Sequence, residues 1–231
     1  MAPPIRPDAQ AVLFDAGGTL IELDFPFIAE CAAEQGVSVD VPGLRRGEVL
    51  ARRRIDEGGR RAGRVEGDDA SRRFRYFAVL LESAGVDPQA AAPIVDRLEA
   101  SHAEGLLWRV PIEGAAETLA GLRRRGLRIG VVSNADGRVE AMLRELALAA
   151  HLEIVIDSHV EGVEKPDPEI FRRAVTRLDL APARTFYVGD IYSIDAVGAR
   201  AAGLTPVLLD PLGGYPDVDC ATIAALQELL A

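Results

Sequence analysis

Short apolar runs alternate with helix-period apolar stripes along the C-terminal half of the chain. The runs predict buried strands near residues 128–132, 154–156, 185–188 and 205–209. Apolar positions spaced three and four apart predict helices over 112–119, 139–146, 171–178, 194–201 and 223–230. Strands separated by helices of this length form parallel sheets that are covered on both faces. The pattern therefore predicts an α/β, doubly wound (Rossmann-like) fold.

The segment from residue 22 to residue 107 follows a different pattern. Its apolar stripes, for example over 74–81 and 91–98, have helical spacing, and the segment contains no convincing strand pattern. It comes directly after a first predicted strand that ends at Phe14. We expect a core domain made of residues 1–21 and 108–231, with an all-helical domain, residues 22–107, inserted into it.

The first strand ends abruptly at a carboxylate. Val12-Leu13-Phe14 leads into Asp15, and Ala16-Gly17-Gly18-Thr19 follows. This order places a lone Asp at the carboxyl end of a buried strand, on a glycine loop that can wrap around an anion. Ligands of open α/β sheets bind at this edge.

Polar residues also follow the other predicted strands of the core. Ser133-Asn134 ends one strand, the loop before Lys165 follows another, and Asp190 ends a third, with Asp195 five residues further on. In a parallel sheet these ends share an edge, so the side chains can converge with Asp15. Carboxylates beside one ammonium and one hydroxyl suit Mg²⁺ together with an anion.

Lys165 is conspicuous in the composition. Of the 26 basic residues it is the only Lys, and the other 25 are Arg. In a chain that uses Arg wherever a generic cation is needed, a lone Lys is a candidate for a site that needs a compact ammonium instead of a planar guanidinium. Chance survival of one surface Lys is the alternative, and the context Glu164-Lys165-Pro166-Asp167-Pro168 favours the site.

Four motifs in order resemble the haloacid dehalogenase-like hydrolase superfamily over nearly the whole chain. The family's Asp-x-Asp-Gly-Thr motif corresponds to Asp15–Thr19, and its Ser or Thr after a strand corresponds to Ser133. Its Lys-Pro corresponds to Lys165-Pro166, and its Gly-Asp-x4-Asp to Gly189-Asp190 through Asp195. The helical insert resembles the cap domain that many members carry.

The resemblance implies a role for each matching residue. Asp15 would be a nucleophile that forms an aspartyl-phosphate, with Lys165 and Ser133 as its catalytic partners. The implied metal ion is Mg²⁺, held by Asp15, the backbone carbonyl of Gly17, Asp190 and Asp195. The residues implied to contact the substrate are Gly18, Thr19, Ser133, Asn134 and Lys165, with Thr19 expected mainly to brace the loop.

Gly17 is the departure from the family pattern. Most phosphatases of the family have at this position an Asp that protonates the leaving alcohol and then activates water, which contributes roughly 10²- to 10⁴-fold to the rate. Three interpretations follow. The substrate has a good leaving group, such as an acyl or aryl phosphate; or the cap or the substrate supplies the acid; or the chain binds metal and phosphate with little or no hydrolysis.

Dehalogenation is the remaining alternative. Dehalogenases of the family also lack the second Asp, but they typically have Tyr at the position of Gly17 and do not keep Gly-Asp-x4-Asp. The presence of Asp190 and Asp195 favours a metal and a phosphorylated substrate.

Composition narrows the class of protein further. A net charge of −10 argues against general nucleic-acid binding. No apolar run approaches the ~18 residues that cross a bilayer, and the N-terminus lacks the apolar core of a secretory signal. Cys31 and Cys220 show neither disulfide nor metal spacing. We expect a cytoplasmic monomer or homodimer that acts on a small phosphorylated substrate.

Within the insert, three features are weaker candidates. Residues 45–75 hold eleven Arg against six acidic residues, an excess that could attract an anionic substrate, although solvated helix faces with i,i+4 partners are the favoured interpretation. Arg53 and Glu57 are an expected i,i+4 pair. His102 is a possible substitute acid, and Trp108 is expected to pack where the insert returns to the core.

Overall fold

The computed structural model describes residues 4–62 and 69–231 of the chain, and side chains outside residues 59–73. The chain divides into two compact units. One combines Met1–Glu22 with Val110–Ala231, and the other is Leu23–Arg109.

A parallel six-stranded sheet forms the first unit, as the pattern predicted. Its strand order is β5-β4-β1-β6-β7-β8, and every neighbouring pair is parallel. The strands are β1 (Ala11–Phe14), β4 (Arg128–Ser133), β5 (Ile154–Asp157), β6 (Thr185–Gly189), β7 (Thr205–Leu209) and β8 (Ala221–Ile223). The first strand of the sequence lies in the middle of the sheet, so the residue that follows it emerges between two other strand ends.

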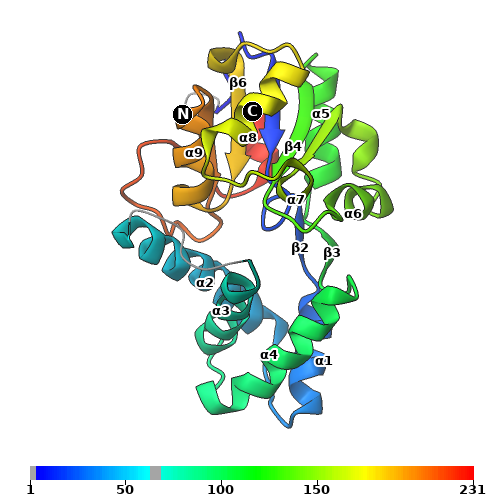
Figure 1. The fold of residues 1–231 in the computed structure, drawn as a ribbon, viewed down its shortest axis with the longest axis vertical. Coiled ribbons are helices and arrows are strands. Elements are labelled where there is room, and N and C mark those ends of the chain that lie inside the picture. Colours follow the sequence, from blue (N-terminus) through cyan, green and yellow to red (C-terminus); the bar gives the residue numbers. More distant parts are fainter. Residues whose placement is uncertain (1–3, 63–68) are drawn as a thin grey trace. The chain divides into compact units, whose positions relative to one another are not determined.

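Helices cover the sheet. Those of the first unit are α5 (Ala115–Arg124), α6 (Val139–Glu145), α7 (Ser158–Glu161), α8 (Pro168–Arg177) and α9 (Val197–Ala201). Residues of α8 and α9, two helices that Figure 1 shows beside the sheet, form one apolar cluster with Leu13, Val132 and Tyr187 of the sheet. Because β1 and β6 are buried at every position, both faces of the central strands are covered, as in other parallel sheets. The α/β, doubly wound fold is confirmed.

The predicted helix over 223–230 is wrong at its start. Ile223 ends strand β8, which pairs with β7, and only Leu226–Leu230 is helical, as a 3-10 segment. A three-residue edge strand is too short to display a period of two, so the apolar spacing from Ile223 to Leu230 imitated one helix.

Two further short strands were missed. β2 (Ile21–Leu23) pairs with β3 (Trp108–Pro111) in a two-stranded sheet. The boundaries between the two units fall within these strands. The sequence predicted no strand at either position, only the start and the end of the helical insert. The backbone bond from Asp24 N–H to the Leu107 carbonyl, 2.8 Å, continues the pairing.

The second unit is helical. Its helices are α1 (Phe25–Glu34), α2 (Val41–Ala62), α3 (Asp69–Ser83) and α4 (Pro88–Ala103). Asp24 and Asp87 cap α1 and α4 by accepting backbone N–H bonds, which satisfies donors that helix starts leave unpaired. Trp108 stacks on Tyr76 and packs against the apolar core of this unit. Among residues 4–62 and 69–231, none of the helices combines the length and apolarity needed to cross a membrane.

Candidate active site

Asp15 leaves the sheet at the carboxyl end of β1, between the ends of β4 and β6. Its N–H donates to the carbonyl of Val188, so the strand pairing holds the backbone up to this residue. The loop then folds back, because the Ala16 carbonyl accepts from the N–H groups of Leu20 and Ile21 at 2.8 and 2.9 Å. Gly18 takes the left-handed turn, φ 78°. The Asp15 side chain is thereby fixed in a nearly buried position.

The ammonium of Lys165 lies directly against Asp15. Lys165 Nζ is 2.9 Å from Asp15 Oδ1 and 2.7 Å from Asp195 Oδ1. It also donates to the hydroxyl of Tyr187 at 2.9 Å. The Lys165 side chain is 1% exposed. The only Lys of the chain is therefore completely enclosed among acceptors from the end of β1, from β6 and from the helical turn that follows β6.

Asn134 fixes the backbone of Lys165. Its amide oxygen accepts from the Lys165 N–H at 2.7 Å, and its amide nitrogen donates to the Lys165 carbonyl at 2.9 Å. From the other side, α9 approaches the same loop at Gly198, where a Cβ would lie 2.8 Å from the Pro166 carbonyl. Together, the Asn134 hydrogen bonds and the close approach of Gly198 fix the position of the Lys165-Pro166 backbone.

Asp195 connects the Lys165 ammonium to the loop after β6. Its Oδ2 accepts from the N–H groups of Asp190 and Ile191 at 3.0 and 2.9 Å. Asp195 lies on the helical turn Tyr192–Ala196, as the five-residue spacing from Asp190 predicted. Gly189 makes room for it, since a Cβ at that position would be 2.3 Å from the Asp195 carboxyl carbon. The Gly and both Asp residues of this motif thus form one packed unit.

Three carboxylates meet at the site. Asp15, Asp190 and Asp195 are all buried, and each offers an oxygen within 4.8 Å of the others. Three negative charges against one ammonium leave a net charge of minus two in a buried place. An oxygen-only donor set with this charge fits a hard divalent cation such as Mg²⁺, which takes few carboxylates and keeps several waters.

Burial and neighbouring charges shift the pKa values of Asp15 and Lys165. Burial raises the pKa of Asp15 above its ordinary value, against the opposing effect of Lys165. Burial alone would lower the pKa of Lys165, but Asp15 and Asp195 outweigh it and raise that pKa. The ammonium therefore stays charged inside the site.

Ser133 occupies the position that the sequence predicted. It ends β4, it is buried, and its hydroxyl acts to lower the pKa of the Asp15 carboxyl. Gly17 follows in the loop after Asp15 and is half-buried. Both residues belong to the same sheet edge as Lys165.

Three of the residues implied to contact the substrate are engaged within the protein, and Thr19 braces its surroundings as expected. The Thr19 hydroxyl is fully buried and donates to Asp190 Oδ1 at 3.1 Å, so it braces a carboxylate instead of contacting a ligand. The Gly18 N–H donates to the Ile21 carbonyl at 2.8 Å, so it is engaged within the loop. The Asn134 amide is engaged by the Lys165 backbone on both its donor and its acceptor side.

Tyr187 is the site residue that the sequence analysis missed. It lies within β6 in an apolar run, where it reads as one more core residue. Its hydroxyl nevertheless contacts Lys165 and donates toward the Val132 carbonyl, 2.8 Å away. A buried tyrosine needs a partner for its hydroxyl, and that need was the available signal.

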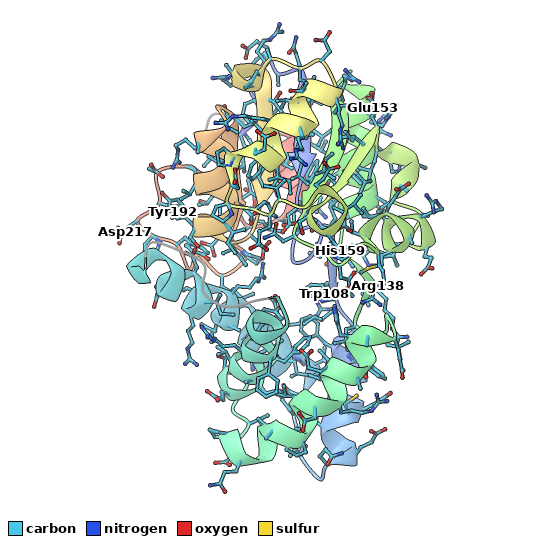
Figure 2. The ribbon with its side chains drawn as sticks, in the orientation of Figure 1. Trp108, Arg138, Glu153, His159, Tyr192 and Asp217 are labelled. Carbon is cyan, nitrogen blue, oxygen red and sulfur yellow. The ribbon has the colours of Figure 1, made fainter. Side chains whose placement is uncertain are left out.

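Two further carboxylates, Asp157 and Asp136, stabilise the loops that follow β4 and β5. Asp157, which ends β5, accepts from the N–H groups of Gly137 and His159, both at 2.9 Å. Arg138, labelled with His159 in Figure 2, pairs with Asp136 on the loop after β4. Asp157 therefore shapes the loops beside the site.

The weaker candidates of the insert lie in the second unit. His102 is in the last turn of α4, and its role as an acid stays a prediction. Arg53 and Glu57 form the expected exposed pair at 3.3 Å. The side chains of Arg60, Arg61, Arg64, Arg72 and Arg73 lie outside the described residues.

Comparison with known proteins gives three curated relatives of particular interest. The human haloacid dehalogenase-like hydrolase domain-containing protein 3 is 34% identical over 220 residues, which are 90% of this chain and 86% of that protein. Its mouse counterpart is 43% identical over 127 residues, 54% of this chain, and the match spans about half (50%) of the mouse protein. A ribulose-1,5-bisphosphate 5-phosphatase from Halopiger xanaduensis is 29% identical over 235 residues, with 95% and 92% of the two chains covered.

Solved structures share the fold. A dehalogenase crystal structure superposes with a TM-score of 0.64 at 23% identity, covering 96% of this chain and 95% of the other. The magnesium-bound HAD-hydrolase YfnB of Bacillus subtilis gives a TM-score of 0.63 at 20% identity, with 96% of each chain covered. At these identities the likeness concerns the fold alone.

The family profile of haloacid dehalogenase-like hydrolases matches residues 9–203, which include the strand ends that carry Asp15, Ser133, Lys165, Asp190 and Asp195. The human relative extends this match over most of both chains. This chain therefore belongs to the haloacid dehalogenase-like hydrolases.

Proposed function

We propose that this chain is a Mg²⁺-dependent phosphatase that hydrolyses a small phosphorylated metabolite through an aspartyl-phosphate on Asp15. The observation that carries the proposal is the contact between Asp15 and the enclosed ammonium of Lys165, beside the Asp190 and Asp195 carboxylates. The phosphatase activity named for the Halopiger xanaduensis relative supports the same reaction class.

In the proposed first step, the Asp15 carboxylate attacks phosphorus and the bond from phosphorus to the leaving oxygen breaks. The electron pair of that bond goes to the leaving group. Lys165 lies beside the attacking carboxylate and lowers the repulsion between two anions, because phosphoryl transfer depends mainly on positioning and charge stabilisation. Ser133 and the Gly17 N–H are placed to hold phosphoryl oxygens. In the second step, water attacks phosphorus, the bond from phosphorus to the Asp15 oxygen breaks, Asp15 returns as a carboxylate, and the water proton leaves with the phosphate or passes to solvent.

Asp15, Asp190, Asp195 and the Gly17 carbonyl are the proposed ligands of Mg²⁺. Bound Mg²⁺ would supply positive charge next to the phosphoryl group. Asp195 adds negative charge to the site, but both of its oxygens are already engaged, by Lys165 on one side and backbone N–H groups on the other. We therefore expect Asp195 to be the weakest ligand of the three carboxylates.

Gly17 shapes the proposed substrate range. An Asp at this position would be the proton donor for an alcohol leaving group, and glycine has no such group. We propose substrates whose leaving groups need little protonation, which are acyl phosphates and aryl phosphates. Gly17 equally favours the rival function, a chain that binds metal and phosphate with little hydrolysis.

A panel of aryl, acyl and alkyl phosphates, assayed with Mg²⁺, tests the proposal. The wild type should hydrolyse the aryl and acyl compounds, and both chelator and Asp15→Asn should abolish that activity. Asp157→Asn is the matched control, because Asp157 is a buried strand-end carboxylate whose described contacts are all backbone N–H groups, those of Gly137, His159 and Val139. Activity that persists in Asp15→Asn would contradict the nucleophile assignment, and a fully inactive wild type that still binds Mg²⁺ would favour the rival.

A further inference from the structure

The ammonium of Lys165 has three N–H donors, and each has an acceptor in this structure. Two are carboxylates, Asp15 at 2.9 Å and Asp195 at 2.7 Å. The third acceptor is neutral, the hydroxyl of Tyr187 at 2.9 Å. Three acceptors around one nitrogen fix both its position and the directions of its protons.

Tyr187 is held more rigidly than a surface tyrosine. Its ring is completely buried in β6 and packs edge-on against Phe171 of α8, with 4.9 Å between the ring centroids. Its hydroxyl is anchored to the Val132 carbonyl of β4 at 2.8 Å. The hydroxyl is therefore a fixed point that belongs to the sheet.

The two carboxylates cannot serve as such fixed points during the proposed reaction. Asp15 is the residue that would be phosphorylated, so its charge and its contacts change within each cycle. Asp195 is anchored by the N–H groups of Asp190 and Ile191, but it is a proposed metal ligand, so its charge would be shared with Mg²⁺; its Oδ1 also lies 3.2 Å from the Tyr187 hydroxyl. Only Tyr187, among the three acceptors of the ammonium, lies outside the groups that react or bind metal in the proposed mechanism.

We propose that Tyr187 is a positioning residue, whose hydroxyl holds the Lys165 ammonium against Asp15 while the charge on Asp15 changes. The proposal rests on the proposed function for its kinetic consequence, but the contact itself can be tested without any substrate. Tyr187→Phe removes the hydroxyl alone and keeps the ring that packs on Phe171.

Because Lys165 is the only lysine, lysine labelled with ¹³C or ¹⁵N gives one side-chain signal that needs no assignment. We expect the Lys165 Cε and Nζ resonances to move in Tyr187→Phe. Tyr192→Phe is the matched control: it removes a hydroxyl that bonds Asp219 at 2.6 Å, and Figure 2 shows Tyr192 as a labelled side chain of the same unit. The lysine signal should stay in place in this control.

Kinetics give the second readout. Tyr187→Phe should lower kcat about 10- to 100-fold with KM within a factor of two, because a displaced ammonium affects the transferring phosphoryl group more than substrate binding. If Tyr187 had only a structural role, Tyr187→Phe would lower the melting temperature but would not lower kcat selectively while KM stayed unchanged. Lysine resonances that superpose on those of the wild type would overturn the proposal, whether or not the chain hydrolyses any phosphate.

One measurement covers the case in which Tyr187→Phe fails to fold. In the wild type, an ammonium enclosed by three acceptors should show a ¹H–¹⁵N cross-peak at neutral pH, where exposed lysine ammonium protons exchange too fast to be observed. The absence of that cross-peak would contradict the three-acceptor geometry.

Discussion

Lys165 Nζ and Asp15 Oδ1 are 2.9 Å apart, although 150 positions separate the two residues in the sequence. The parallel sheet brings them together, because β1 and β4 are neighbours and the loop that carries Lys165 is bound to Asn134 at the end of β4. A buried carboxylate with a buried ammonium is stable as a pair, and loss of either partner would leave an uncompensated charge.

Replacement of Lys165 tests the shape of this pocket. Lys165→Arg should lower turnover nearly as much as Lys165→Met, by roughly 10²-fold or more, because a planar guanidinium does not fit where a side chain 1% exposed is enclosed by three acceptors. Steady-state kinetics measure the effect. An Arg variant with most of the wild-type kcat would mean that any cation suffices there.

Metal binding depends on Asp190 in this account. Asp190→Asn should weaken Mg²⁺ binding by about tenfold or more, because it removes a charged oxygen from a site with few ligands. Calorimetric titration measures the affinity directly. The matched control is Asp210→Asn, since Asp210 follows the neighbouring strand β7, is buried, and accepts from the N–H groups of Gly214 and Tyr215. Equal affinities in the Asp190 variant and the wild type would refute the metal assignment.

Gly189 should be intolerant of even a methyl group. A Cβ there would lie 2.3 Å from the Asp195 carboxyl carbon, so Gly189→Ala should destabilise the protein by about 1–3 kcal/mol. Gly58→Ala is the contrasting control, because its Cβ would meet nothing within 4 Å and alanine favours the helix by up to about 1 kcal/mol. Urea unfolding compares the two. The expectation fails if Gly189→Ala unfolds at the wild-type midpoint.

Glu161 gives the chain an acid-sensitive contact. Arg177 and Arg173 lower the pKa of the Glu161 carboxyl below its ordinary value. A carboxyl whose pKa is lower in the folded state stabilises the fold fully above the unfolded pKa, about 4.3, and loses that contribution as pH falls through the folded pKa. The melting temperature of Glu161→Gln should therefore lie below that of the wild type at pH 7.

The difference between Glu161→Gln and the wild type should shrink as the pH falls below about 4.3. Glu140→Gln, which removes one partner of an exposed i,i+4 pair with Arg144, is the control and should have little effect at pH 7. A difference for Glu161→Gln that grows toward acid pH would have the wrong sign.

Strand ends were the predictable part of this molecule. Asp15, Ser133 and Asp190 each follow a buried apolar run, and the parallel order that such runs imply brings them to one edge. The sequence also made Lys165 stand out by its rarity. The sequence could not predict which side chains hydrogen-bond each other, because a contact between residues of different strands and loops leaves no periodic pattern in the sequence.

Tyr187 and Asn134 show the limit of the sequence most clearly. A tyrosine inside an apolar run looks like a core residue, and its contact with Lys165 follows only from the depth of the loop that carries the lysine. Asn134 was assigned to the substrate by its place beside Ser133, but its amide matches the N–H and C=O of Lys165 instead. The short strands β2, β3 and β8 have three or four residues, too few for alternation to be recognised.

Gly17 leaves the proposed reaction without a proton donor for the leaving group. The left-handed residue of the loop is Gly18, φ 78°, and Gly17 is half-buried without a positive φ, so the backbone conformation at position 17 does not require glycine. Gly17→Asp should raise turnover of alkyl phosphates by up to about 10²-fold, because it restores a proton donor, while aryl phosphates gain little in their first step. Steady-state assays on matched alkyl and aryl phosphates measure this selectivity.

The absence of a base at position 17 has a second consequence, because the same group would activate the water that frees Asp15. With an aryl phosphate, formation of the aspartyl-phosphate should therefore be fast and its hydrolysis slow. Rapid-mixing measurement of aryl alcohol release tests the central claim most directly. The account predicts a burst of about one aryl alcohol per protein molecule, followed by slow turnover, that is absent in Asp15→Asn and reduced in Gly17→Asp. Release that is linear from the first turnover and unchanged by Asp15→Asn would contradict it.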